Sequence, residues 1–389
     1  MAVRTWSGSV NANFNNTGNW VEGAVPTNAD DVVFSTNNNM TINVASTCHN
    51  LNFGTYTGLF TISTTNNLVV TGNLTLSSAG MTFSNTGSGA VSLAPTGGSG
   101  SVSIVCSTQS FLVNVQFNGT NTYTLSGGNN FIIKNFSGSG TPITINTTTT
   151  EQLEVKGNFT SNGGGGIISG TATLLFSGSG TWSAGGAIQS NLIINTSGTI
   201  NITGPVAYNT GTFTYTAGTI TTSGQLNIGA NTTWNNVGNI PWTNVSLSAT
   251  TQTINTTPFT MTGTLTLAAG TTTFSGTAGF SISNFSSSSA GANYVLKNGN
   301  TYTVNGNFSF IGTNASHITI KSDSTGSIAY LNVTSRSTVI LALYCNATDI
   351  DSSGGQNINQ YGGTISASCV NWDTLSTFQW PAQTNISLW

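Results

Sequence analysis

The sequence predicts an all-β chain wound into a parallel β-helix (β-solenoid) of about 14 to 15 coils. Three observations favour this fold class. Short segments alternate apolar and polar residues, clusters of Gly, Asn and Ser separate these segments, and one loose motif recurs at multiples of about 21 residues. Tandem β-sandwiches are the alternative fold, because they also combine short strands with frequent turns.

The alternating segments are typical of strands that bury one face. Residues Asn73–Leu76 and Thr264–Leu267 read Asn-Leu-Thr-Leu and Thr-Leu-Thr-Leu. Successive side chains of a strand point to opposite faces, so the leucines would face a core and the polar residues water. Glycine-rich segments such as 97–100 and 163–166 would form turns between strands.

The recurring motif is apolar-x-apolar, followed after two or three polar or glycine residues by another apolar residue. Its copies begin 63, 22, 106 and 43 residues apart, at Leu68, Phe131, Leu153, Phe259 and Tyr302. These gaps approach multiples of about 21 residues, a suitable length for one coil. The copies are therefore expected to stack on one another at the strand spacing of about 4.8 Å.

Charge is nearly absent from the sequence. The 389 residues include six Lys or Arg and nine Asp or Glu, and no charged residue lies between Asp31 and Lys134 or between Lys156 and Lys297. Stacked coils account for this, because a column of like charges would repel itself. The lack of basic patches argues against nucleic acid as a partner, and no apolar stretch is long enough to span a membrane.

The two ends differ from the middle of the chain. Exposed terminal coils of a solenoid invite aggregation, so we expect residues 1–40 to form an N-terminal cap or attachment segment. Residues 41–345 would form the rod, and residues 346–389 a C-terminal cap that could also mediate oligomerisation. Five tryptophans are assigned to capping and docking: Trp6, Trp20, Trp372, Trp380 and Trp389.

Both ends carry motifs found in other proteins. Trp6-Ser-Gly8, Gly18-Asn-Trp20 and the segment 30–34 resemble a leader of bacteriophage virion proteins and of bacterial adhesin-like β-helices. The segments 349–356 and 361–363, with Asn371-Trp372, resemble the tail of similar phage structural proteins.

The resemblance implies a virion-surface protein: a tail fibre, a tail-tip component or a capsid decoration. Its partners would be other virion proteins and host surface polysaccharide, and a homo-oligomer such as a trimer is expected. The N-terminus lacks the apolar core of a signal peptide, which fits synthesis in the host cytoplasm. An extracellular protein whose leader has been removed is the alternative.

Candidate catalytic residues are few, and no catalytic site is predicted. Strand alternation would place Glu151 and Glu154 on opposite faces, unlike the paired carboxylates of glycoside hydrolysis. Lys156 would stack over Lys134, with Glu154 diagonal to both, as a surface ion-pair cluster. His49 and His317 have no acidic partner nearby in sequence.

A calcium site is an alternative to the expected absence of cofactors. Asp349, Asp351 and Ser353 match the first half of a calcium loop, D-x-D-x-S-G, but the closing position falls on Gln360. Turn chemistry explains the same residues without a metal. Cys345 and Cys369 lie about one coil apart, within reach of a disulfide, although cytoplasmic synthesis favours buried thiols.

Four aromatic residues in the middle of the chain are candidates for glycan binding: Trp182, Tyr208, Trp234 and Trp242. Exposed rings could stack on sugars while Asn and Thr provide hydrogen bonds. The alternative is that these rings fill the core.

The sequence therefore predicts a non-enzymatic structural or binding protein with a neutral surface rich in Thr, Asn and Ser. One alternative is a tailspike-like polysaccharide depolymerase whose carboxylates come from different coils or subunits. Another is a secreted adhesin or ice-binding solenoid, indicated by Thr-x-Thr runs such as Thr212-Phe-Thr-Tyr-Thr216.

Overall fold

The fold is a parallel β-solenoid of about 13 turns, slightly fewer than expected. The computed structural model describes residues 1–95, 100–139, 143–162, 168–184, 187–203, 206–208, 211–222, 225–229, 233–236, 244–248, 250–256, 258–268, 270–335 and 340–376. Within these ranges the one helical element is the short 3-10 helix η1 (Thr17–Asn19), and the paired strands run parallel. Parallel pairing rules out the antiparallel sandwiches considered as the alternative fold. The chain divides into two compact units, Met1–Val206 and Ala207–Trp389.

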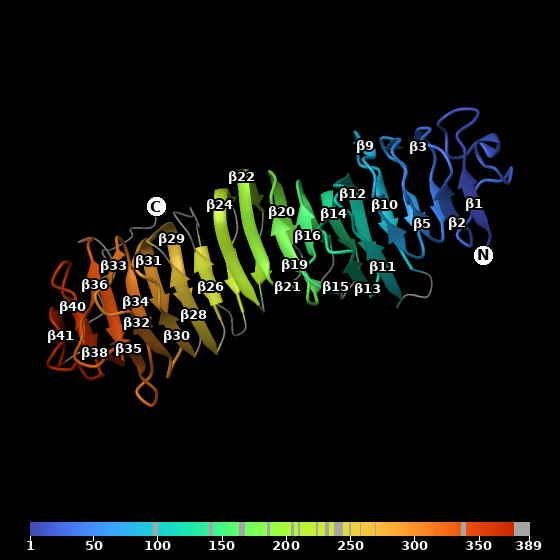
Figure 1. Cartoon of the computed structure of the whole chain (residues 1–389). Coiled ribbons are helices and arrows are strands. Elements are labelled where there is room, and N and C mark those ends of the chain that lie inside the picture. Colours follow the sequence, from blue (N-terminus) through green and yellow to red (C-terminus); the bar gives the residue numbers. More distant parts are fainter. Residues whose placement is uncertain are drawn as a thin grey trace, which may run out of the picture. The chain divides into compact units, whose positions relative to one another are not determined.

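Three parallel sheets make up the first unit (Figure 1, blue to green). Its first sheet contains β1 (Val3–Trp6), β2 (Asp31–Phe34), β5 (Leu51–Asn52), β8 (Leu74–Thr75), β11 (Ser101–Val105), β13 (Thr122–Ser126), β15 (Ile143–Thr147), β18 (Ile168–Ser169) and β21 (Ala187–Gln189). Its second sheet contains β4 (Ser46–Cys48), β7 (Leu68–Val70), β10 (Ala90–Leu93), β12 (Phe111–Asn118), β14 (Phe131–Ser139), β16 (Gln152–Val155), β17 (Phe159–Asn162), β19 (Thr173–Phe176), β20 (Gly180–Ala184) and β22 (Leu192–Ile202). The third sheet is short: β3 (Met40–Ile42), β6 (Leu59–Ile62) and β9 (Thr82–Asn85).

The second unit contains strands of two parallel sheets (Figure 1, yellow to red), and β23 (Val206–Tyr208) spans the boundary between the units. One sheet contains β25 (Gln225–Ile228), β27 (Asn244–Leu247), β29 (Phe259–Leu267), β31 (Phe280–Ser287), β33 (Thr301–Val304), β34 (Phe308–Ile311), β36 (Ala329–Val333), β37 (Ile340–Leu343), β39 (Ile350–Asp351), β40 (Ile358–Tyr361) and β41 (Trp372–Thr374). The other contains β24 (Thr212–Thr222), β26 (Thr233–Asn236), β28 (Thr251–Thr256), β30 (Thr271–Phe274), β32 (Asn293–Leu296), β35 (Ile318–Ser322) and β38 (Cys345–Thr348).

Columns of apolar side chains form the core, one residue per coil. In the second sheet of the first unit, strand pairing stacks Leu68, Val91, Val115, Phe136, Phe159, Trp182 and Ile202 in one column. Each of these side chains is almost fully buried. The rings of Phe136 and Phe159 stack with centroids 4.5 Å apart. Because strand side chains alternate, the residues on either side of each column member point outward.

The predicted register is confirmed in part. Phe131 pairs with Leu153, as the motif predicts, and Phe259 pairs with Phe280 one coil before Tyr302. The equivalence of Leu68 and Phe131 is wrong, because the column of Leu68 contains Phe136. The coils vary in length, so counting in steps of 21 residues slips by several positions over three coils.

The N-terminal segment covers the outer edge of β1. The Glu22 carboxylate accepts hydrogen bonds from the Thr5 backbone N–H and hydroxyl, both at 2.8 Å, and Val21 N–H donates to the Thr5 carbonyl at 3.0 Å. Trp6 and Trp20 form an antiparallel bridge, and their buried rings meet edge-on at 5.1 Å. Parallel pairing already begins between β1 and β2, inside residues 1–40.

At the other end of the chain, Trp372 is 6% exposed, and its indole N–H donates to the Ser352 hydroxyl at 2.9 Å. Trp380 and Trp389 lie outside the described residues. The assignment of both ends as caps stays a prediction.

Candidate functional site

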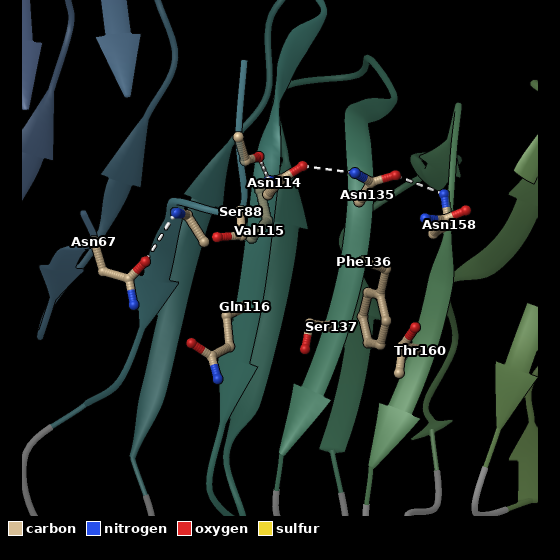
Figure 2. Close-up of a pocket in the computed structure, with 12 residues that line it drawn as sticks. Asn67, Ser88, Asn114, Val115, Gln116, Asn135, Phe136, Ser137, Asn158 and Thr160 are labelled. Atoms are coloured by element: carbon tan, nitrogen blue, oxygen red, sulfur yellow. Dashed lines mark hydrogen bonds between the residues drawn. The ribbon is translucent and has the colours of Figure 1, made fainter. Parts of the chain in front are cut away.

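The candidate site is an open hollow on the outward face of the second sheet in the first unit. Its volume is about 560 Å³, and it crosses β10, β12, β14 and β17 (Figure 2). Its lining is mainly small and polar: Asn67, Gly87, Ser88, Ala90, Asn114, Val115, Gln116, Asn135, Phe136, Ser137, Asn158 and Thr160. None of these residues is charged. The hollow therefore offers hydrogen-bonding groups without an ionic field.

Strand alternation places the polar side chains of the hollow. On β14, Phe136 points into the core, so Asn135 and Ser137 on either side of it point outward. On β12, Gln116 lies between the buried Val115 and Phe117 in the same way. Parallel register then stacks equivalent outward residues of successive coils into columns. Three such columns cross this face.

The first column consists of Asn114, Asn135 and Asn158, and five of its six amide N and O atoms bind protein groups. Asn135 Nδ2 donates to Asn114 Oδ1 at 2.7 Å, and Asn135 Oδ1 accepts from the backbone N–H of Asn158 at 2.6 Å. Asn114 Nδ2 donates to the carbonyls of two glycines in the 86–90 turn at 2.9 and 3.0 Å. Asn158 Oδ1 in turn accepts from Thr181 N–H at 2.8 Å. Figure 2 shows this chain of amides running from strand to strand.

A second column, at the far side of the same strands, is also closed. Asn118 and Ser139 pair in register, and the Ser139 hydroxyl donates to Asn118 Oδ1. Asn118 Nδ2 donates to the Ser92 hydroxyl, one coil earlier. These side chains bind their neighbours within the sheet.

The middle column consists of Gln116, Ser137 and Thr160, which stack through the register of β12, β14 and β17. Within the described residues, none of these three side chains forms a hydrogen bond to another protein group. Each is partly exposed. An amide and two hydroxyls can each donate and accept, so this column presents unused donors and acceptors along the floor of the hollow.

Sequence reasoning missed the middle column, although a signal for it exists. Gln116, Ser137 and Thr160 are 21 and 23 residues apart, close to one coil each. The sequence does not show that the neighbouring columns bond internally, because those hydrogen bonds depend on the register.

Two of the four predicted glycan-binding aromatic residues lie in the core. Trp182 is 0% exposed and packs against Phe176 with ring centroids 5.3 Å apart. Tyr208 is also 0% exposed and meets Phe213 edge-on at 5.7 Å. These positions fit the alternative in which the rings fill the core. Trp234 pairs in register between Phe213 and Ile254, and Trp242 lies outside the described residues.

The charged residues of the first unit form local structural contacts. Glu154 binds Lys156 Nζ at 2.5 Å and the Ser177 hydroxyl at 2.6 Å. Lys134 does not join this cluster, contrary to expectation, because its Nζ donates to the Asn85 carbonyl at 2.6 Å. Glu151 lies at a turn, where it accepts from the backbone N–H groups of Gly128 and Thr149, both at 2.9 Å.

Hydrogen bonding controls the ionisation of both glutamates. Burial opposes ionisation of Glu151, but the N–H donors of Gly128 and Thr149 outweigh it and lower its pKa to about 2. Burial likewise opposes ionisation of Glu154, and Lys156 and Ser177 hold its pKa below the usual range. Both groups are stabilised as carboxylates.

His49 has an acidic partner on the preceding coil. Its Nδ1 lies 2.9 Å from Asp31 Oδ1, and Asn50 Nδ2 donates to the same oxygen at 2.8 Å. Asp31 lies 18 residues earlier in the sequence, so the contact joins successive coils and is not apparent from local sequence.

The proposed calcium ligands are engaged by the protein. The Asp349 carboxylate accepts from Gly326 N–H at 2.8 Å and from the Ser368 hydroxyl at 2.5 Å. These donors lower its pKa. Asp351 Oδ1 accepts from Ser353 N–H at 2.7 Å, a turn contact. Over the described ranges, no group of three His, Cys, Asp or Glu residues could hold a metal ion.

The four cysteines are free thiols. Cys345 is buried and Cys369 is partly exposed, with no disulfide between them. Burial raises the pKa of Cys345 to about 12, and the pKa of Cys106 likewise to about 12. Buried thiols of this kind are not reactive nucleophiles.

No family model, curated protein or solved structure matches this chain. Among the described residues, no helix is long and apolar enough to cross a membrane. The fold and the contacts above are consistent with a structural or binding protein.

Proposed function

We propose that the chain is a non-enzymatic structural and binding β-solenoid on the surface of a phage virion, where it binds host glycan. The observation that carries the binding role is the uncharged hollow with its middle column of free amide and hydroxyl groups. The resemblance of the two ends supports the virion location, with other virion proteins as partners and a homo-oligomer, such as a trimer, as the assembled form. Synthesis in the host cytoplasm belongs to the same proposal.

The state of the carboxylates supports binding over polysaccharide cleavage. A glycoside hydrolase needs a carboxylic acid with a raised pKa to protonate the leaving group. The pKa values of Glu151 and Glu154 are lowered instead, because donors and a lysine stabilise their charged forms. Neither group is therefore suited to act as a general acid at neutral pH.

Two measurements test this proposal. Antibody raised against the purified chain should label the tail or the head surface of intact virions in electron micrographs of particles that carry the gene. Incubation of the chain with host polysaccharide should release no new reducing ends. Particles without label would refute the virion location. New reducing ends that disappear with Glu151→Gln and Glu154→Gln together would establish the depolymerase alternative.

A threonine column in the second unit favours a second candidate function, an adhesin or ice-binding solenoid. Register stacks Thr212, Thr233, Thr253 and Thr273 on successive strands of one face. In the run 212–216, the buried Phe213 and Tyr215 alternate with outward threonines. Threonines at one strand spacing form a regular array of hydroxyl and methyl groups, which could order water.

Thermal hysteresis of the purified chain tests this second candidate. Hysteresis that is lost when Lys replaces Thr253 and Thr273 would establish it. Absence of thermal hysteresis at high protein concentration would dismiss the ice-binding function.

A further inference from the structure

We infer that the column Gln116–Ser137–Thr160 is the binding site for a linear neutral polysaccharide, whose chain runs along the stacking direction across successive coils. The inference depends on the binding role proposed above and is independent of the virion location. It also moves the site away from the tryptophans singled out in the sequence.

The hydrogen bonds of the three columns point to the middle column as the binding site. Asn135 on one side and Asn118 on the other have both amide atoms bound to protein groups. A ligand would have to break those bonds before it could use the flanking amides. The side chains of Gln116, Ser137 and Thr160 form no hydrogen bond to protein groups among the described residues, so a ligand can bind them without breaking a bond of the sheet.

The chemistry of the column matches hydroxyl groups. The Gln amide and the Ser and Thr hydroxyls each donate and accept, as a sugar hydroxyl does. A phosphate or a carboxylate ligand accepts only and favours cationic partners, and the lining of the hollow contains no cation. A neutral polyol is therefore the ligand class that this lining fits.

The geometry matches a polymer. The three residues occupy consecutive strands, about 4.8 Å apart, and Figure 2 shows them in a row across the hollow. Phe136 lines the hollow but is only 1% exposed, so little ring surface is available for stacking. Each coil thus contributes hydrogen bonds with little apolar contact, and useful affinity requires several sugars bound at once.

The test compares two matched sets of substitutions in the full chain. The first set replaces the open column: Gln116→Ala, Ser137→Ala and Thr160→Val. The control set makes three similar changes at outward residues of β11 and β13, in the first sheet of the first unit: Ser103→Ala, Thr122→Val and Thr124→Val. Far-UV circular dichroism and the urea midpoint establish that both variants are folded.

Affinity electrophoresis through gels containing amylose, mannan or dextran measures binding, with alginate as an anionic comparator. We expect the chain to be retarded by at least one neutral polysaccharide, equally at low and high salt. The first set should weaken this retardation about tenfold or more, because three hydrogen bonds are lost. The control set should leave it unchanged.

Three outcomes would overturn the inference: no retardation by any of the neutral polysaccharides, equal retardation of the first set and the unaltered chain, or retardation by alginate alone. Unlabelled virions together with column-dependent retardation would refute the virion location and leave the inference standing. Labelled virions without retardation would do the reverse.

Discussion

The two neighbouring columns Asn114–Asn135–Asn158 and Gln116–Ser137–Thr160 lie on the same strands, yet they differ in what their polar groups bind. Amides of the first column bridge successive coils at 2.6 to 2.8 Å. Side chains of the middle column, Gln116, Ser137 and Thr160, bond to no other protein group within the described residues. The side chains of both columns are polar and at least partly exposed, so these two properties do not distinguish the columns. Their hydrogen bonds separate a column that holds coils together from one that can bind a ligand.

Removal of the core beneath both columns should have the largest effect. Phe136 lies between Asn135 and Ser137 and stacks on Phe117 and Phe159. Phe136→Ala should lower the free energy of unfolding by about 3–5 kcal/mol, because it leaves a cavity in a close-packed column. Urea denaturation followed by circular dichroism measures the change. A loss below about 1 kcal/mol would show that the stacked rings contribute little.

Substitution within the closed column should have the next largest effect. Asn135→Ala removes the donor to Asn114 Oδ1 and the acceptor of Asn158 N–H. The expected cost is about 1–3 kcal/mol, the penalty of leaving such groups unpaired. The same urea titration measures it, with Ser137→Ala as the control on the same strand. Equal stability of the two variants would contradict the proposed difference between the columns.

Glu151 links coils as Asn135 does, but with a charge, so pH can test its contribution. Its pKa is about 2 in the folded chain and about 4.5 unperturbed. A lowered pKa in the folded state stabilises the chain above pH 4.5, and this contribution is lost as the pH falls from 4.5 toward 2. Glu151→Gln should flatten this acid limb of the stability curve and cost about 1 kcal/mol at pH 7.

Thermal midpoints measured from pH 7 down to pH 2 in the wild-type chain and in Glu151→Gln provide this comparison. Asp373→Asn, at an exposed residue in the second unit, is the control. An unchanged acid limb in Glu151→Gln would assign the pH dependence to other carboxylates.

Changes in the open column should have the smallest effect on stability. Ser137→Ala and Thr160→Val should each alter the free energy of unfolding by no more than about 0.5 kcal/mol, because no protein hydrogen bond is lost. Differential scanning calorimetry should show nearly identical midpoints. A marked destabilisation would mean that the middle column also has a structural role.

The sequence predicts parallel stacking and the approximate length of a coil, but not which residues of successive coils align. Phe131 and Leu153 pair as expected because they are separated by one coil of ordinary length. Leu68 does not align with Phe131, because the three coils that begin at Leu68, Val91 and Val115 are 23, 24 and 21 residues long, which brings Phe136 into the column. Turn length decides which residues of successive coils align, and the sequence of a glycine-rich turn says little about that alignment.

The site was less predictable than the fold. The sequence allows Trp182 to be either an exposed ring or a core ring, and strand pairing with Phe159 places it in the core. The contact between His49 and Asp31 joins adjacent coils and cannot be inferred from local spacing. The Gln116 side chain differs from its neighbours in forming no hydrogen bond to protein groups among the described residues. Those neighbouring hydrogen bonds depend on the register of the coils, which local sequence does not reveal.

The segment that binds Thr5 at the outer edge of β1 also bears on self-association. Since Glu22 and Val21 occupy the Thr5 N–H and carbonyl, a strand from another molecule cannot extend the first sheet at this residue. Another molecule could extend the first sheet here only after Val21 and Glu22 detach from Thr5. A covered edge of this kind allows molecules to reach a high local concentration while each remains a separate folding unit.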